Sequence, residues 1–126
     1  NNVFQKFVFL LVLAVTFQLS YCKRKKPIEG FDSDIWTEDV HGCDGKRVEM
    51  MGDLLKVKFK MRGKKTSEIE DILGPPDGIE LYKRDQKYYI YYMEPGPECG
   101  NPKEKPLKLF VRFTAVGIAN ELSVRN

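Results

Sequence analysis

The residues of this sequence that could do chemistry are three cysteines, Cys22, Cys43 and Cys99, and a single histidine, His41. His41-Gly42-Cys43 offers two soft metal ligands, but the chain has no second pair of ligands at the spacing that zinc sites use. No nucleophile and base can be paired around His41, so we predict no catalytic residue, no metal and no cofactor. A buried, oriented polar cluster around His41 would instead favour a small secreted hydrolase or a metal-dependent enzyme.

Charge elsewhere in the chain points to no particular ligand. Four acids gather near the beginning of the chain, but they lack the spacing and the glycine of a calcium loop, so we expect a solvated acidic segment (Asp32, Asp34, Glu38, Asp39). The net charge of +3 over 126 residues is small, and no basic stripe with interleaved aromatics is present. Nucleic acid is therefore not an expected partner.

The beginning of the chain is apolar from Phe7 to Phe17, interrupted only by Thr16 and preceded by Lys6. A run of this length is typical of the central part of a secretion signal and is too short to cross a bilayer as a stable helix. We therefore expect residues 1–22 to be a signal that exports the remainder.

The end of this run, Leu19-Ser20-Tyr21-Cys22, resembles a lipobox, in which Cys22 is acylated and becomes the first residue of the mature chain. Tyr21 departs from that pattern, because a small residue is usual there. Ordinary cleavage after Cys22 is the alternative, with small side chains at Ser20 and Cys22.

A basic cluster follows directly, formed by Lys23, Arg24, Lys25 and Lys26. Behind a lipidated cysteine these cations would lie at the headgroups of an anionic leaflet, where each adds roughly 1 kcal/mol, or they would form a solvated tether. Such a cluster also tends to remain in the cytoplasm, so a membrane anchor that leaves the domain inside is a third interpretation.

In either form of export Cys22 cannot form a disulfide, because it is acylated or removed with the signal. Cys43 and Cys99 then remain as an even pair in an oxidising compartment. We predict a disulfide between them, worth roughly 4 kcal/mol in the chain-entropy account. Two unpaired thiols are the alternative.

Hydrophobic periodicity predicts two helices. Residues 23–45 are polar and irregular, with Trp36 as the one large apolar anchor that packs on the core. Residues 47–61 follow the helical period and end at Gly63. Ser67 and Glu70 have the spacing of a capping box for a second, short helix, which Gly74 and the prolines after it terminate.

After Asp77 the period changes to two and predicts four strands, near 79–83, 87–93, 107–113 and 119–125. The long proline-rich connection at 94–106 needs a tether, which Cys99 supplies. The expected fold is therefore α+β, with two helices packed on one face of a four-stranded antiparallel meander sheet, over residues 46–126.

The segments Gly63-Lys64-Lys65-Thr66-Ser67-Glu68-Ile69 and Leu73-Gly74-Pro75-Pro76-Asp77 resemble the second-helix signature of the SmpA/OmlA (BamE-like) lipoproteins. Their pattern runs glycine, a short gap, serine or threonine, two acidic or amide residues, valine or isoleucine, and then Leu-Gly-x-Pro. The resemblance implies a β-lactamase-inhibitor-like fold and a small lipoprotein of the bacterial cell envelope, in the periplasm at a membrane such as the outer membrane. The remaining segments are closer to uncharacterised small lipoproteins of this fold than to the β-barrel assembly component.

The sheet is the most informative feature for binding. Tyrosines point to both faces of the second strand, and the helices can cover only one face. The uncovered face should then carry tyrosine, phenylalanine and arginine, which are enriched at binding hot spots. Tyrosine also favours wet sheet faces for structural reasons alone. The candidate protein-binding residues are Tyr82, Tyr89, Tyr91, Phe110 and Arg112.

The leading hypothesis is a non-enzymatic envelope lipoprotein, tethered by Cys22, whose domain binds another envelope protein or supports its assembly. The alternative is a freely secreted or periplasmic binding or inhibitor module.

Overall fold

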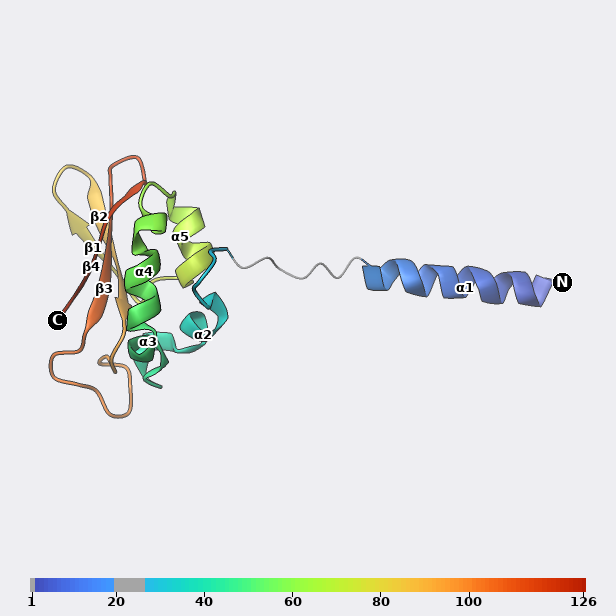
Figure 1. Cartoon of the computed structure of the whole chain (residues 1–126), viewed down its shortest axis with the longest axis horizontal. Helices are drawn as coiled ribbons and strands as arrows, with labels where there is room; N and C mark the ends of the chain where they lie inside the picture. Colours follow the sequence, from blue (N-terminus) through green and yellow to red (C-terminus); the bar gives the residue numbers. More distant parts are fainter. Residues whose placement is uncertain (1, 20–26) are drawn as a thin grey trace.

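The four strands form one antiparallel sheet in the order β1-β2-β3-β4, with helices packed against one of its faces (Figure 1). The structure is a computed structural model that describes residues 2–19 and 27–126. The strands are β1 (Gly78–Tyr82), β2 (Gln86–Tyr92), β3 (Lys108–Phe113) and β4 (Ala119–Arg125). The predicted α+β class and meander order are therefore confirmed.

The helical layer contains more elements than the sequence predicted. α4 (Met51–Met61) and α5 (Thr66–Leu73) are the two expected helices, but α2 (Ser33–Glu38), η1 (Val40–Gly42) and α3 (Lys46–Glu49) precede them. The expectation of an irregular segment up to residue 45 was wrong there, because Asp32 caps α2 by accepting a hydrogen bond from the amide of Ile35 at 3.3 Å.

The cap of α5 also differs from its prediction. The carboxylate of Glu68 accepts a hydrogen bond from the amide of Lys65 at 3.0 Å, so the N-cap is Lys65, two residues before the predicted Ser67. Ser67 lies within the first turn of α5, and Glu70 instead accepts a hydrogen bond from the hydroxyl of Tyr89.

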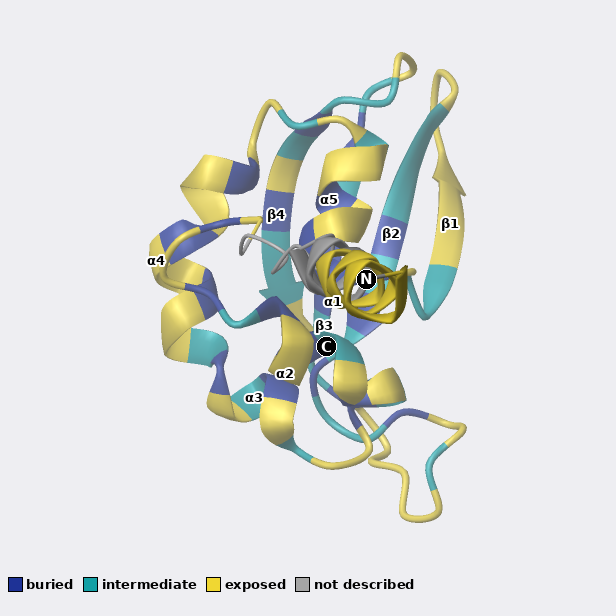
Figure 2. Ribbon diagram, turned by 90° about the vertical axis from the view of Figure 1, so that its right-hand side faces the viewer, coloured by how far each residue is buried: buried dark blue, intermediate teal, exposed yellow. Residues whose placement is uncertain are grey.

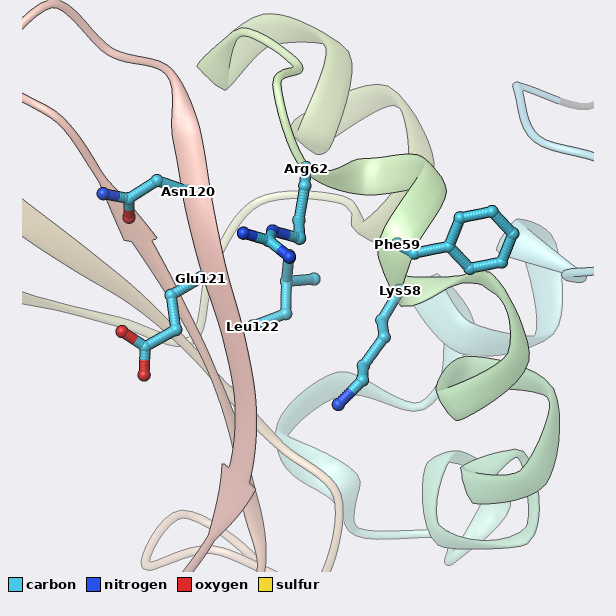
Figure 3. A pocket seen from close by; sticks show the side chains of 6 residues that line it. All are labelled: Lys58, Phe59, Arg62, Asn120, Glu121 and Leu122. Carbon is cyan, nitrogen blue, oxygen red and sulfur yellow. The ribbon is translucent and has the colours of Figure 1, made fainter.

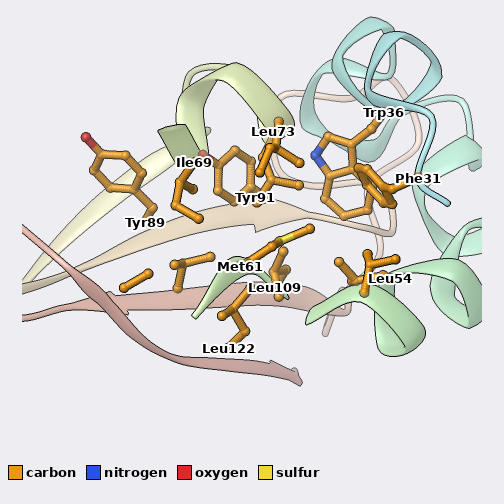
Figure 4. Packing of buried hydrophobic residues seen from close by; sticks show 14 of the residues in the cluster. Phe31, Trp36, Leu54, Met61, Ile69, Leu73, Tyr89, Tyr91, Leu109 and Leu122 are labelled. Carbon is orange, nitrogen blue, oxygen red and sulfur yellow. The ribbon is translucent and has the colours of Figure 1, made fainter. Parts of the chain in front are cut away.

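The hydrophobic core lies between the helices and the sheet (Figure 4). α4 contributes Leu54, Val57 and Met61, which lie on one stripe of the helix at spacings of three and four residues. Trp36 is fully buried, as predicted, and its ring lies 5.5 Å from that of Phe31 and 6.4 Å from that of Tyr91. The α2 segment is thus part of the core, and its burial ties residues 28–38 to the sheet.

Helix α1 (Asn2–Leu19) contains the predicted apolar run, and its described side chains, residues 2–12, are exposed (Figure 2). Within residues 2–19 and 27–126, no helix combines the length and apolarity needed to cross a bilayer. The predicted lipidation site Cys22 and the basic cluster Lys23, Arg24, Lys25 and Lys26 lie outside the described residues.

Candidate functional site

One face of the sheet is left uncovered by the helices of residues 2–19 and 27–126, and strand register defines the residues of that face. Tyr88 pairs with Arg112 and Ile90 with Phe110, while Phe110 pairs with Ser123 across β3 and β4. Directly opposite residues share a face of an antiparallel pair. We call this surface the open face; its members are Glu80, Tyr82, Gln86, Tyr88, Ile90, Tyr92, Lys108, Phe110, Arg112, Glu121, Ser123 and Arg125.

Aromatic rings form a chain across the open face. The ring centroid of Tyr82 lies 5.2 Å from that of Tyr88, and Tyr88 lies 6.0 Å from Phe110, both in edge-on geometry. Such arrangements are favourable because the positive edge of one ring meets the negative face of the other. Backbone pairing of β1, β2 and β3 sets the spacing of these rings on the face that the described helices leave uncovered.

Cationic side chains lie over this aromatic row. The guanidinium of Arg125 stands 3.7 Å from the ring centroid of Phe110, and that of Arg112 stands 5.9 Å from Tyr82. The ammonium group of Lys108 lies 5.7 Å from both Tyr92 and Phe110. Phe110 is only 5% exposed although it lies on the face without helices. On the open face, three cations therefore stack on aromatic rings, while its two acids, Glu80 and Glu121, lie on the edge strands β1 and β4.

Two of the predicted binding residues lie on the opposite face. Tyr89 pairs with Val111 and Tyr91 with Leu109, so both point toward the helices, and they are 5% and 0% exposed. The assignment of Tyr89 and Tyr91 to a binding surface was wrong for this reason. Tyr82, Phe110 and Arg112 do lie on the open face.

The hydroxyl groups of Tyr89 and Tyr91 fasten α5 to the sheet. Tyr89 donates to the Glu70 carboxylate at 2.8 Å, and Tyr91 donates to the carbonyl of Gly74 at 2.9 Å. Burial, helped by the hydrogen bond to Glu70, raises the pKa of Tyr89 to about 12. Burial likewise raises the pKa of Tyr91 above its ordinary value. Both phenols are therefore neutral structural donors.

Sequence reasoning did not name Arg125 as a binding residue. Its signal was present, because Leu122 and Val124 were expected to point inward, which places Arg125 outward with Ser123. What the pattern could not give was the stacking of Arg125 on Phe110, since that contact joins two strands.

A second group of polar residues lies where η1, α3 and the beginning of β1 meet. The guanidinium of Arg47 donates to the carboxylate of Asp77 at 2.7 Å and to the carbonyl of Trp36 at 2.8 Å, and Arg47 is 2% exposed. Asp77 also accepts hydrogen bonds from the backbone amides of Tyr92 and His41. The Asp77 carboxylate thus joins three separate parts of the chain.

His41 stands at the edge of this cluster. Its Nδ1 lies 3.4 Å from Asp77, and its Nε2 lies 2.6 Å from the exposed carboxylate of Glu98. Residue 41 has a φ of 60°, and the next residue, Gly42, packs so closely that a Cβ there would lie 2.8 Å from the carbonyl oxygens of Tyr92 and Glu94. Glycine is therefore required at position 42.

The predicted disulfide closes the same region. Cys43 and Cys99 are bonded, with their Cα atoms 5.4 Å apart, and the amide of Gly96 donates to the carbonyl of His41 at 3.2 Å. The bridge attaches the loop between β2 and β3 to η1. It thereby places Glu98 beside His41, 57 residues away in the chain.

The acidic segment is only partly solvated, in contrast to its prediction. Asp39 is 1% exposed and accepts hydrogen bonds from the amides of Asp44 and Arg47. No cluster of three or more histidine, cysteine or carboxylate groups suited to a metal occurs among the described residues. A shallow cavity of about 240 Å³ beside the cluster is lined by Thr37, Val40, His41, Arg47, Leu73, Gly74, Pro75, Pro76 and Asp77.

No family model, curated protein or solved structure matches this chain.

Proposed function

We propose that this chain is a non-enzymatic, membrane-tethered envelope protein whose domain binds another envelope protein through the open face. The observation that carries the proposal is the stacking of Arg125, Lys108 and Arg112 on a row of aromatic rings. Stacked arginines and tyrosines combine large contact area with little freedom to lose, as in the energetic centres of protein interfaces.

The partner that best fits this surface carries acidic groups. The stacked cations on the open face keep part of their hydrogen-bonding capacity, and Arg112 already binds Glu121 at 2.9 Å and Asn120 at 3.3 Å. A partner carboxylate can compete for the guanidinium of Arg125, which has no carboxylate partner among the described residues. The geometry suits charge-assisted, bidentate hydrogen bonds.

The disulfide supports the exported location in this proposal, because such bonds persist in oxidising compartments. The tether remains a prediction for Cys22. Mass spectrometry of the mature N-terminus tests it: a diacylated Cys22 supports a lipoprotein, and a chain beginning at Lys23 supports the freely periplasmic or secreted alternative. The resemblance of residues 63–69 and 73–77 to the SmpA/OmlA lipoproteins supports the same proposal.

The binding face is tested by photo-crosslinking in the native envelope. A photoreactive phenylalanine analogue in place of Ser123, on the edge strand β4 opposite Phe110, should give one dominant protein adduct identified by mass spectrometry. The same analogue at Lys105, an exposed position on the β2–β3 loop, should not give it.

A charge-matched pair of variants decides whether the face itself binds. Arg112→Glu/Arg125→Glu should abolish the adduct at position 123, because it replaces the stacked cations by repelling carboxylates. Arg84→Glu/Lys105→Glu makes the same charge change at exposed positions of the β1–β2 turn and the β2–β3 loop and should preserve the adduct. An adduct that survives the first pair would refute binding through the open face.

A second candidate function is a small exported hydrolase, favoured by the contact of His41 Nδ1 with Asp77 at 3.4 Å. A carboxylate at Nδ1 orients the imidazole of a general base. In the described part of the chain, no serine or threonine hydroxyl contacts that ring, and Nε2 is occupied by Glu98. Turnover of ester or peptide substrates that disappears in His41→Gln, with folding retained, would establish this alternative.

A further inference from the structure

The outer side of α4 carries a dense positive charge. Residues 51–67 contain Lys56, Lys58, Lys60, Arg62, Lys64 and Lys65 against a single acid, Asp53 in the first turn of α4. None of these six cations forms an ion pair within the part of the chain that the structure describes. All but the half-buried Lys64 are exposed. An uncompensated patch of this density attracts anions across a Debye length.

Two apolar side chains lie inside this patch. Leu55 is 47% exposed and Phe59 is 64% exposed, and they are four residues apart on α4. At about 100° per residue, Phe59 points about 180° away from the centre of the buried stripe Leu54, Val57 and Met61. Phe59 therefore cannot contribute to the core, and α4 has a second apolar stripe facing solvent.

The cations flank this second stripe on both sides. By the same helical geometry, Lys58 and Arg62 lie on the flank nearer β4, and Lys56 and Lys60 lie on the other flank. Figure 3 shows the side chains of Lys58 and Arg62 in the gap between α4 and β4, while the ring of Phe59 points away from the sheet. Lys58 and Arg62 line a cavity of about 240 Å³ there, with Phe59, Asn120, Glu121 and Leu122. The carboxylate of Glu121 is already paired with Arg112, so the cavity retains an excess of positive charge.

We propose that the outer side of α4 docks on an anionic lipid surface, with Leu55 and Phe59 in the interfacial region and the flanking cations at phosphate headgroups. An apolar stripe bordered by lysine and arginine is the pattern of helices that lie in the plane of a membrane interface. A nucleic acid would satisfy the cations but would leave Leu55 and Phe59 in water, so the lipid surface explains both features.

The position of residues 27–32, which precede α2, agrees with this orientation. These residues cross α4 where Gly30 approaches Val57. A Cβ added at Gly30 would lie 3.5 Å from the Cγ1 of Val57. They therefore join the domain on the helical side, opposite the open face (Figure 1). A domain docked through α4 would present the open face away from the membrane.

Brominated lipids test the docking with the full chain. In Phe59→Trp, the new indole should be quenched by vesicles of brominated phosphatidylglycerol and phosphatidylcholine, but not by brominated phosphatidylcholine alone. Trp36 is fully buried, so the parent protein gives the constant background. Val116→Trp places an indole outside α4 at a site that is more exposed than Phe59, at 84%, and should not be quenched. This pair separates docking of α4 from any membrane binding by α1.

Charge dependence completes the test. Lys58→Gln/Arg62→Gln, added to Phe59→Trp, should weaken docking by roughly 25-fold, since each cation near an anionic surface contributes roughly fivefold. Lys83→Gln/Lys105→Gln removes the same charge elsewhere and should preserve the quenching. Equal quenching in both lipid mixtures, or none in the anionic one, would overturn the proposal.

Two further measurements separate this proposal from others. The first measurement adds an oligonucleotide to Phe59→Trp. If the oligonucleotide changes the emission of the indole and anionic vesicles do not, the surface binds nucleic acid and lipid docking is refuted. Arg112→Glu/Arg125→Glu should leave the quenching intact, because the open face and α4 are on opposite sides of the sheet. Failure of lipid docking is thus distinguishable from failure of protein binding.

Discussion

The guanidinium Nη1 of Arg47 lies 2.7 Å from the Asp77 Oδ2, with both side chains buried. Arg47 also donates to the carbonyl oxygens of Trp36 and Tyr92, and its guanidinium stands 5.1 Å from the Trp36 ring centroid. One side chain of α3 thus contacts α2, β2 and the residue that precedes β1. The Arg47–Asp77 pair therefore has a structural role, since its donors and acceptors are mutually satisfied and hold these elements together.

Removing Arg47 alone should be severely destabilising. Arg47→Met leaves the Asp77 carboxylate buried without its cation, which should lower the free energy of unfolding by about 3–5 kcal/mol in urea titrations. Arg47→Met/Asp77→Leu should recover part of this loss, because no uncompensated charge remains. A double variant no more stable than Arg47→Met would contradict the assignment of the loss to the unpaired carboxylate.

The neighbouring Lys46 provides the matched control. Its ammonium group lies 3.9 Å from Glu49, and both side chains are exposed. Lys46→Met should change the free energy of unfolding by less than about 1 kcal/mol, because exposed pairs are screened by solvent.

Removing the disulfide should loosen the β2–β3 loop and destabilise the domain. Cys43→Ser/Cys99→Ser should lower the free energy of unfolding by about 2–4 kcal/mol, because the bridge restricts a long stretch of the unfolded chain. Hydrogen exchange should rise first in residues 94–106, which the bridge attaches to η1. Unchanged stability and exchange in the double variant would contradict a stabilising role for the bridge.

Acid should weaken the attachment of this loop through Glu94. The carboxylate of Glu94 accepts hydrogen bonds from the ammonium group of Lys103 and from the amide of Leu107, which lower its pKa below the ordinary 4.5. A carboxyl with a lowered folded-state pKa adds stability above its unfolded pKa, and that stability is lost as the pH falls through the folded value. The melting temperature should therefore drop as the pH is lowered from 4.5.

Two variants isolate this contribution. Glu94→Gln should be less stable than the parent at neutral pH and should lose less stability on acidification. Glu104→Gln, at an exposed position in the same loop, should keep the parent's pH profile. If Glu94→Gln followed the parent's profile in parallel from neutral pH to pH 3, another carboxyl would have to carry the acid sensitivity.

The sheet could be predicted from the sequence because each strand carries its own signal. Alternation at Leu109, Val111 and Phe113 indicates both the strand and the face that is buried. The faces of β2 could not be assigned in the same way, because tyrosines occupy both sides of that strand. Only the register with β3 separates Tyr89 and Tyr91 from Tyr88 and Tyr92.

The short helices and the polar cluster could not be predicted for a related reason. α2 and α3 have six and four residues, too few for a helical period to emerge from the pattern. Their stability comes from distant partners, such as Asp77 for Arg47 and the sheet for Trp36. The disulfide was predictable because counting cysteines requires no knowledge of the fold.

Arg125 offers the sharpest separation of binding from stability. Its guanidinium covers Phe110 at 3.7 Å and also lies 5.7 Å from Tyr88, yet the residue itself is exposed. Arg125→Ala should lower the free energy of unfolding by no more than about 1 kcal/mol, the value of an exposed cation–π contact. The crosslinked adduct at position 123 should nevertheless decrease sharply, because the partner loses a bidentate donor and meets a less ordered Phe110.

Arg125→Lys refines this expectation. Lysine keeps the charge but lacks the planar fork, so the adduct should stay well below that of the parent if stacking and bidentate bonding matter. Full recovery by lysine would mean that charge alone attracts the partner. A loss of stability in Arg125→Ala as large as that in Arg47→Met would instead make Arg125 a structural residue and remove it from the binding surface.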